Sequence, residues 1–175
     1  MYTELVVKTS DATGGMWAPL ITYNLYITGA DVQNGIYNHD LEALAADDFQ
    51  TIPIVAINRP LTPGNGAIFG EIHDCGNVRL QHASVDVSAS RTDLVYFNAD
   101  EDNPLPDINS TGTSRTALYA ALDMAPGFAR VAAAGLMPDG KGGTKLVSLG
   151  YYDVRVFPDS VTRVSLRGLR PYQEP

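Results

Sequence analysis

The stretch Thr116–Ala134, TALYAALDMAPGFARVAAA, constrains the fold more than any other part of this chain. Apolar side chains recur at every second position on both sides of the turn sequence Ala125-Pro126-Gly127. Such alternation is typical of β-strands, and Pro-Gly is typical of a tight turn because proline presets φ and glycine accepts a positive φ. The stretch predicts a strand, a corner and a second strand at the centre of a sandwich. The side chains expected to face its core are Leu118, Ala120, Leu122, Val131 and Ala133.

Similar strand patterns recur along the rest of the chain. Alternation marks residues 83–87, 152–156 and 162–166, and Leu94–Phe97 is a short apolar run. Glu4–Ser10 and Trp17–Gly29 predict two further strands near the N-terminus. Sixteen glycines and eleven prolines provide the many turns that short strands need. The spacing is typical of a β-sandwich, so the expected fold class is all-β with one short helix.

The expected helix runs from Asn38 to about Asp48, where apolar residues follow an i, i+3, i+4 pattern after a capping Asn38 or Asp40. Thr51–Asn58 (TIPIVAIN) contains β-branched residues and a proline, which favours an edge strand. The Pro/Gly-rich stretch of residues 59–66 follows and is the candidate boundary. We therefore expect residues 1–59 to form strands and the helix, packed on or belonging to the sandwich. Residues 60–175 should form the sandwich itself.

The order of motifs across residues 66–166 resembles that of carboxypeptidase regulatory-like domains. The matching segments are GEIHDCG at residues 70–76, VRLQHASV at residues 78–85, the corner at residues 125–127, and the closing run Val154–Val164. Arg79 and His82 stand where that family usually has proline and glycine. The resemblance implies a transthyretin/prealbumin-like Greek-key β-sandwich. It also implies an accessory module of the bacterial cell envelope or of a secreted protein, without chemistry of its own.

Charge and hydropathy restrict the possible partners. The formal net charge is −8, which disfavours nucleic acid because phosphates need Lys and Arg to neutralise them. No apolar run approaches the roughly 20 residues that span a bilayer, so this chain is not expected to insert into a membrane. The expected partners are other domains of a larger protein, or a surface ligand that is a protein or a carbohydrate. The basic residues near the C-terminus are interpreted as the solvated face of a final strand: Arg155, Arg163, Arg167 and Arg170.

Few residues in the sequence indicate catalysis, and none is assigned a catalytic or cofactor-binding role. The single cysteine, Cys75, is interpreted as buried and structural. The enzymatic alternative is an intradiol-type, ring-cleaving dioxygenase, whose ferric iron needs two tyrosinates and two histidines. Tyr151 and Tyr152 would point to opposite faces of one strand, and no His-x-His pair follows His82. His73 and His82 flank a turn and are interpreted as solvated or hydrogen-bonded surface residues, and His39 is placed at the start of the expected helix.

One acidic loop suggests a metal. Asn98, Asp100 and Asp102 place oxygen donors at alternate positions, as at the start of a calcium loop, and Asp107 follows. The sixth position is asparagine instead of the glycine that such loops need. A solvated acidic turn is expected, with a calcium-stabilised adhesion module as the alternative. The sequence as a whole predicts a non-catalytic structural or binding module of a larger surface or secreted bacterial protein.

Overall fold

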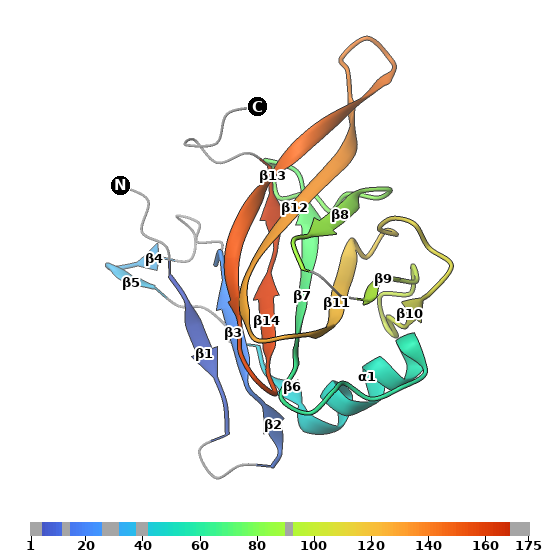
Figure 1. Cartoon of the computed structure of the whole chain (residues 1–175). Coiled ribbons are helices and arrows are strands. Elements are labelled where there is room, and N and C mark those ends of the chain that lie inside the picture. Colours follow the sequence, from blue (N-terminus) through green and yellow to red (C-terminus); the bar gives the residue numbers. More distant parts are fainter. Residues whose placement is uncertain (1–4, 12–14, 26–31, 38–41, 90–92, 169–175) are drawn as a thin grey trace.

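The computed structural model describes residues 5–11, 15–25, 32–37, 42–89 and 93–168. Within these ranges the chain is mostly β-strand with a single helix, α1 (Ala46–Ile57), which confirms the all-β expectation with one short helix. Figure 1 shows the helix lying across one end of the strands.

The larger sheet has eight strands and contains segments from both ends of the chain. In spatial order it runs through β1 (Val7–Thr9), β3 (Leu20–Tyr23), β14 (Val161–Val164), β7 (Gly66–His73), β11 (Leu118–Met124), β9 (Asp93–Phe97) and β10 (Pro106–Asp107). The short β15 (Leu166–Arg167) also pairs with β7. Strand β14 is parallel to both of its neighbours, β3 and β7. It therefore lies in the interior of the sheet, with hydrogen-bonded strands on both sides.

The smaller sheet has three strands in the order β13 (Thr144–Val156), β12 (Gly127–Pro138) and β8 (Ser84–Val87). Figure 1 shows the long β12–β13 ribbon projecting beyond the rest of the molecule. Two short ribbons pair β2 (Trp17–Ala18) with β6 (Leu44–Ala45), and β4 (Val32–Gln33) with β5 (Ile36–Tyr37).

The two sheets pack face to face as a β-sandwich. Their shared core contains Ile68 and Ile72 from β7, Val131 from β12 and Val154 from β13, all nearly inaccessible to solvent. Tyr119 is also fully buried there, and its hydroxyl donates a hydrogen bond to the Val164 carbonyl oxygen at 2.7 Å. Burial raises the pKa of this phenol well above its ordinary value. The Greek-key connectivity implied by the resemblance stays a prediction.

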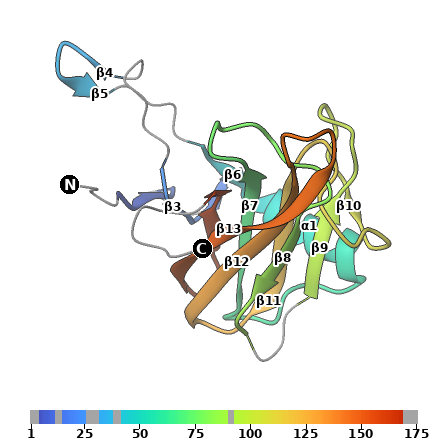
Figure 2. The ribbon, with the colours of Figure 1, turned by 90° about the horizontal axis from the view of Figure 1, so that it is seen from above.

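Helix α1 covers the outer face of the larger sheet and closes a second core. This core joins Ala56 of the helix to Ala67, Val95, Ala120 and other side chains on the outward face of the sheet. Figure 2 shows the resulting order of layers from above, with α1 and β12–β13 on opposite sides of the larger sheet. Strands β7 and β11 are therefore covered on both faces.

The stretch Thr116–Ala134 forms the expected strand, corner and strand, but it faces two cores instead of one. Val131 and Ala133 lie in the sandwich core as expected. Ala120 and Leu122 lie in the second core under α1, with Leu118 packed against it, so their expected orientation was wrong. The side chains of β11 that face the sandwich are Tyr119, Ala121 and Met124. Alternation cannot show which face of such a strand meets which core, because both faces are covered.

The helix lies further along the chain than the sequence predicted. Residues 51–57, expected to be an edge strand, form the last part of α1, and residues 38–41 lie outside the described ranges. Four apolar residues at i, i+3, i+4 and i+7 turn toward the sheet: Phe49, Ile52, Pro53 and Ala56. Packing of this face outweighs the strand preference of the β-branched residues. The last residue of the helix is Ile57. The next residue, Asn58, has a left-handed φ of 55°, which ends the helix, and Pro60 follows two positions later.

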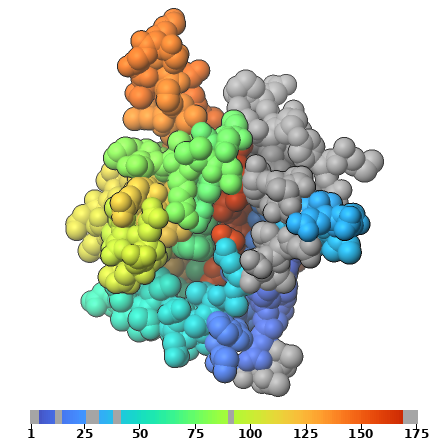
Figure 3. Space-filling view, turned by 180° about the vertical axis from the view of Figure 1, so that it is seen from behind, coloured from blue at the N-terminus to red at the C-terminus, as the bar shows by residue number. Residues whose placement is uncertain are grey.

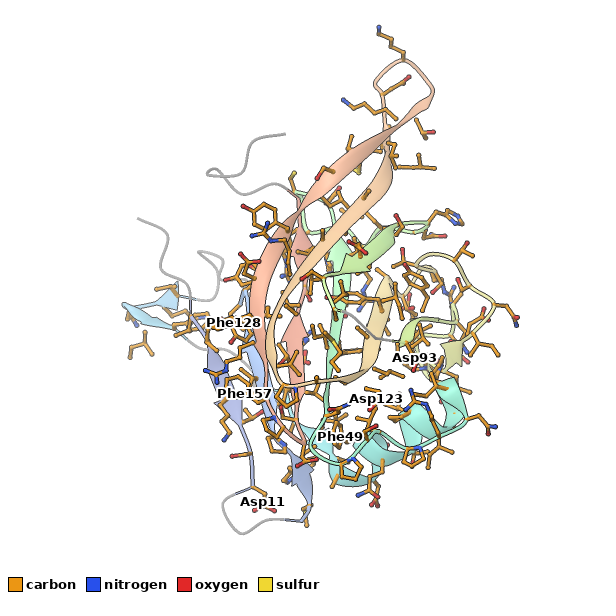
Figure 4. The ribbon with its side chains drawn as sticks, viewed as in Figure 1. Asp11, Phe49, Asp93, Asp123, Phe128 and Phe157 are labelled. Carbon is orange, nitrogen blue, oxygen red and sulfur yellow. The ribbon has the colours of Figure 1, made fainter. Side chains whose placement is uncertain are left out.

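The candidate boundary, residues 59–66, is hydrogen-bonded to Asp123 near the end of β11. Asp123 accepts hydrogen bonds from the Thr62 amide at 2.7 Å and from the Asn65 side chain at 3.0 Å. Arg59 also pairs with Asp123, and its other terminal nitrogen lies 2.6 Å from Asp93. Figure 4 shows Asp93 and Asp123 at the same end of the sandwich. The division into residues 1–59 and 60–175 stays a prediction, although β3 from the first part pairs with β14 from the second.

Candidate functional site

A cavity of about 120 Å³ lies between α1 and the outer face of the larger sheet. Its floor is formed by β7, β11 and β14, and its roof by one face of the helix. The lining is apolar except for two charged side chains, and it comprises Leu20, Glu42, Ala43, Leu44, Phe49, Ile52, Pro53, Leu61, Ala67, Ile68, Phe69, Phe97, Ala120, Leu122, Val161 and Arg163. A concave, apolar space with few polar groups is the usual form of a small-molecule site.

The mixture of small and aromatic residues explains why this space exists. Ala67 and Ala120 place only methyl groups on the floor, while Phe69 and Phe97 border it with rings packed edge to face, their centroids 5.9 Å apart. The aromatic rings stand higher than the alanine methyl groups between them. The bulky side chains of α1 therefore cannot pack tightly against the alanines, and a space remains. In Figure 3, seen from behind, β14 is visible between the cyan segment around α1 and the green segment that follows β7.

Arg163 on β14 provides the positive charge at this cavity. Its side chain is only 17% exposed, and its Nη1 donates to Glu42 at 2.8 Å, whereas the Glu42 side chain is 54% exposed. Within the part of the chain that the structure describes, the buried Nε of Arg163 has no hydrogen-bond partner. The expectation that this arginine lies on a solvated face was wrong. Strand β14 has β3 and β7 on either side and α1 above it, so its outward face is mostly covered.

A charged cluster borders Arg163 on the neighbouring strand β7. Glu71 contacts the Nε2 of His73 at 2.6 Å and Arg79 at 3.3 Å. Burial alone would raise the pKa of Glu71, but the hydrogen bond with His73 and the charges of Arg79, His73 and Arg163 hold it below its ordinary value. The cluster therefore keeps a carboxylate ionised close to Arg163.

His73 has a structural environment and not the surface position that the sequence suggested. It is 6% exposed, and its Nδ1 donates to the Asn77 carbonyl oxygen at 3.1 Å while Nε2 meets Glu71. His82 is exposed and has a φ of 59°, and His39 lies outside the described residues. The expectation for Cys75 was also wrong, because this cysteine is exposed in the turn that follows β7.

The acidic loop uses its oxygens to hold its own backbone. Asn98 Oδ1 accepts from the Asp100 and Leu105 amides, Asp100 Oδ1 accepts from the Asp102 amide, and Asp107 Oδ1 accepts from the Asn109 amide. Among the described residues, no three His, Cys, Asp or Glu side chains converge closely enough to hold a metal ion. Calcium binding by Asn98, Asp100, Asp102 and Asp107 stays a prediction.

The two tyrosines weighed as iron ligands point to opposite faces of β13. Tyr152 is 4% exposed in the sandwich core, whereas Tyr151 is 37% exposed and stacks under the guanidinium of Arg130 at 4.0 Å. The divergence expected from the sequence is confirmed, so these two residues cannot serve one metal ion.

Sequence reasoning missed the cavity because its residues come from segments far apart in the chain. A recognisable signal was present in residues 49–56, where apolar residues follow helical spacing. The burial of Arg163 had no local signal, because it depends on the pairing of β14 with two distant strands.

Comparison of the chain with protein-family models, with curated proteins and with solved structures found no match. Within the described residues, no helix is long and apolar enough to cross a membrane.

Proposed function

We propose that this chain is a non-catalytic binding module of a larger bacterial surface or secreted protein, and that the cavity under α1 is its binding site. The observation that carries the proposal is an apolar space of about 120 Å³ with one largely buried arginine at its lining. The resemblance to carboxypeptidase regulatory-like domains supports an accessory role outside the cytoplasm. The hydrogen-bonded environments of Glu71, His73 and Asp123 also suit positions that hold the fold together.

The proposal is tested by filling the cavity. Ala120→Leu places an isobutyl group on the cavity floor, whereas Ala132→Leu makes the same change on β12, away from the cavity. We expect small apolar compounds at millimolar concentration to raise the melting temperature of the parent protein and of Ala132→Leu, but not that of Ala120→Leu, because a ligand that binds only the folded state stabilises it.

Two results would contradict the proposal. One is a complete absence of shifts in the parent protein across the compound set. The other is an equal set of shifts in Ala120→Leu, which would place binding elsewhere on the molecule. Stoichiometric iron in the purified protein, with a visible tyrosinate absorption band, would instead favour the dioxygenase alternative.

A further inference from the structure

The charged end of the cavity indicates which chemical class of ligand the cavity accepts. We infer that the cavity binds a small monocarboxylic acid whose carboxylate pairs with Arg163 and whose apolar body, about the size of one aromatic ring, lies between α1 and the sheet. This inference rests on the proposed function, because it names the ligand class of that same site.

Within the described part of the chain, the guanidinium of Arg163 has a buried N–H group that is free to bind an acceptor. Its Nη1 is bonded to Glu42, but its Nε lies buried without a partner among the described residues. Buried donors are normally satisfied, so an unpaired one beside a cavity marks a place for an acceptor. A carboxylate can accept from Nε–H and from a neighbouring N–H at once, in the two-bond geometry that guanidinium and carboxylate groups favour.

Glu42 is the carboxylate that pairs with Arg163, and a ligand carboxylate can replace it. Its side chain is 54% exposed and meets Arg163 through a single oxygen, Oε1, at 2.8 Å. Because more than half of the Glu42 side chain is exposed, water can solvate its carboxylate once an incoming carboxylate takes its place beside Arg163. When the carboxylate of a ligand replaces that of Glu42, the net charge beside Arg163 stays the same. A neutral or cationic ligand that displaced Glu42 would leave Arg163 without a counter-ion.

The volume and the lining of the cavity limit the size and the charge of the ligand. A cavity of about 150 Å³ lined by apolar side chains is known to hold benzene. The space of about 120 Å³ found here suits a body of similar size. A phosphate-like dianion is disfavoured, because among the described residues Arg163 is the only cation in the cavity lining, and Glu42 and Glu71 lie close to it.

The test is an NMR titration of the full 175-residue chain with matched compounds. Phenylacetate and hexanoate are the carboxylate probes, phenylacetamide is the neutral isostere, and phenethylamine is the cation. We expect phenylacetate to bind at least about tenfold more tightly than phenylacetamide, because only the carboxylate can form a charge-assisted pair with Arg163. Phenethylamine should bind more weakly than either.

Three variants locate the charged contact. Arg163→Gln should reduce phenylacetate affinity about tenfold or more while changing phenylacetamide affinity little. Glu42→Gln, at an exposed position that does not threaten folding, should raise phenylacetate affinity about threefold or more because it removes the competing carboxylate. Arg155→Gln, on β13 of the other sheet, is the matched control and should change neither affinity.

The outcomes separate the ligand class from the site itself. Equal affinity for phenylacetate and phenylacetamide, or no gain in Glu42→Gln, would overturn the carboxylate inference while the cavity remained a binding site. Failure of every probe, including the neutral one, would overturn the proposed function and the inference together. If Arg163→Gln does not fold, the comparison of the parent protein with Glu42→Gln still decides the inference.

Discussion

At the scale of single residues, Gly70 marks the tightest approach within the larger sheet. A Cβ atom placed on Gly70 would lie 1.8 Å from the Val164 carbonyl oxygen and 3.1 Å from the ring of Tyr119. The same carbonyl oxygen accepts the hydrogen bond from the Tyr119 hydroxyl. The absence of a side chain at position 70 therefore allows β7, β11 and β14 to meet around this buried bond.

Gly70→Ala should consequently be among the most damaging single substitutions in the chain. We expect a loss of about 3–5 kcal/mol in the free energy of unfolding, because backbone atoms and a buried ring must both move. Urea denaturation followed by circular dichroism measures this loss. The control is Gly140→Ala, where a Cβ atom meets nothing within 4 Å but φ is 74°; it should cost only about 1–2 kcal/mol. Equal losses in the two variants would contradict the expectation.

Asp123, near the end of β11, is the second residue with a large structural role, because it joins residues 59–66 to that strand. Burial alone would raise the pKa of Asp123, but hydrogen bonds from Arg59, Thr62 and Asn65 hold it well below its ordinary value of 3.8. A carboxyl group with a lowered pKa in the folded state stabilises the fold at any pH above its unfolded-state pKa. That contribution disappears as the pH falls through the lower, folded-state pKa.

Asp123→Asn should therefore lower stability in a pH-dependent way. At pH 7 we expect a loss of about 1–3 kcal/mol, because charge-assisted hydrogen bonds are replaced by neutral ones. The difference between parent and variant should shrink as the pH falls below about 4, where the parent carboxyl begins to lose its advantage. Urea unfolding at pH 7, 5 and 3 measures this difference, with Asp86→Asn, at an exposed position of β8, as the control. A difference that stays constant from pH 7 to pH 3 would contradict this mechanism.

At the scale of elements, the strands were largely predictable, but the position of the helix was not. Alternation is a local property, so residues 84–87, 93–97 and 152–156 could be assigned from sequence alone. Residues 51–57 are apolar and β-branched, which suits a strand, and only contact with β7 and β11 selects the helix. The same limit applies to the site, because Arg163 alternates in sequence like a surface residue and is buried by strands that are distant in the chain.

Two isoleucines of α1 distinguish helix from strand experimentally. In a strand Ile52 and Ile54 would share one face, but in a helix they lie on nearly opposite faces. Ile52 packs against the second core and lines the cavity, whereas Ile54 is 49% exposed. We expect Ile52→Ala to cost about 2–4 kcal/mol and Ile54→Ala less than about 1 kcal/mol. Similar losses in both variants, measured by urea denaturation, would support a strand and refute the helix.

At the scale of the whole molecule, the three layers depend on segments from both ends of the chain. Strand β14 near the C-terminus pairs with β3 near the N-terminus, and α1 covers the outer face of β7 and β11. Residues 1–59 therefore supply one neighbour of β14 and the helix that covers the second core. The corner at residues 125–127 passes the chain from the helix-covered sheet to the smaller sheet, which places the β12–β13 ribbon on the far side from the cavity.

This dependence predicts the behaviour of a fragment limited to residues 60–175. Without α1 the apolar outer face of β7 and β11 meets water, and without β3 one edge of β14 loses its hydrogen-bonded partner. We expect this fragment to bind a hydrophobic dye strongly and to lack a cooperative thermal transition. A fragment of residues 42–175 keeps α1 and should melt cooperatively, at a lower temperature than the full chain because it lacks β3. Cooperative melting of residues 60–175 within a few degrees of the full chain would show instead that they form an independent domain.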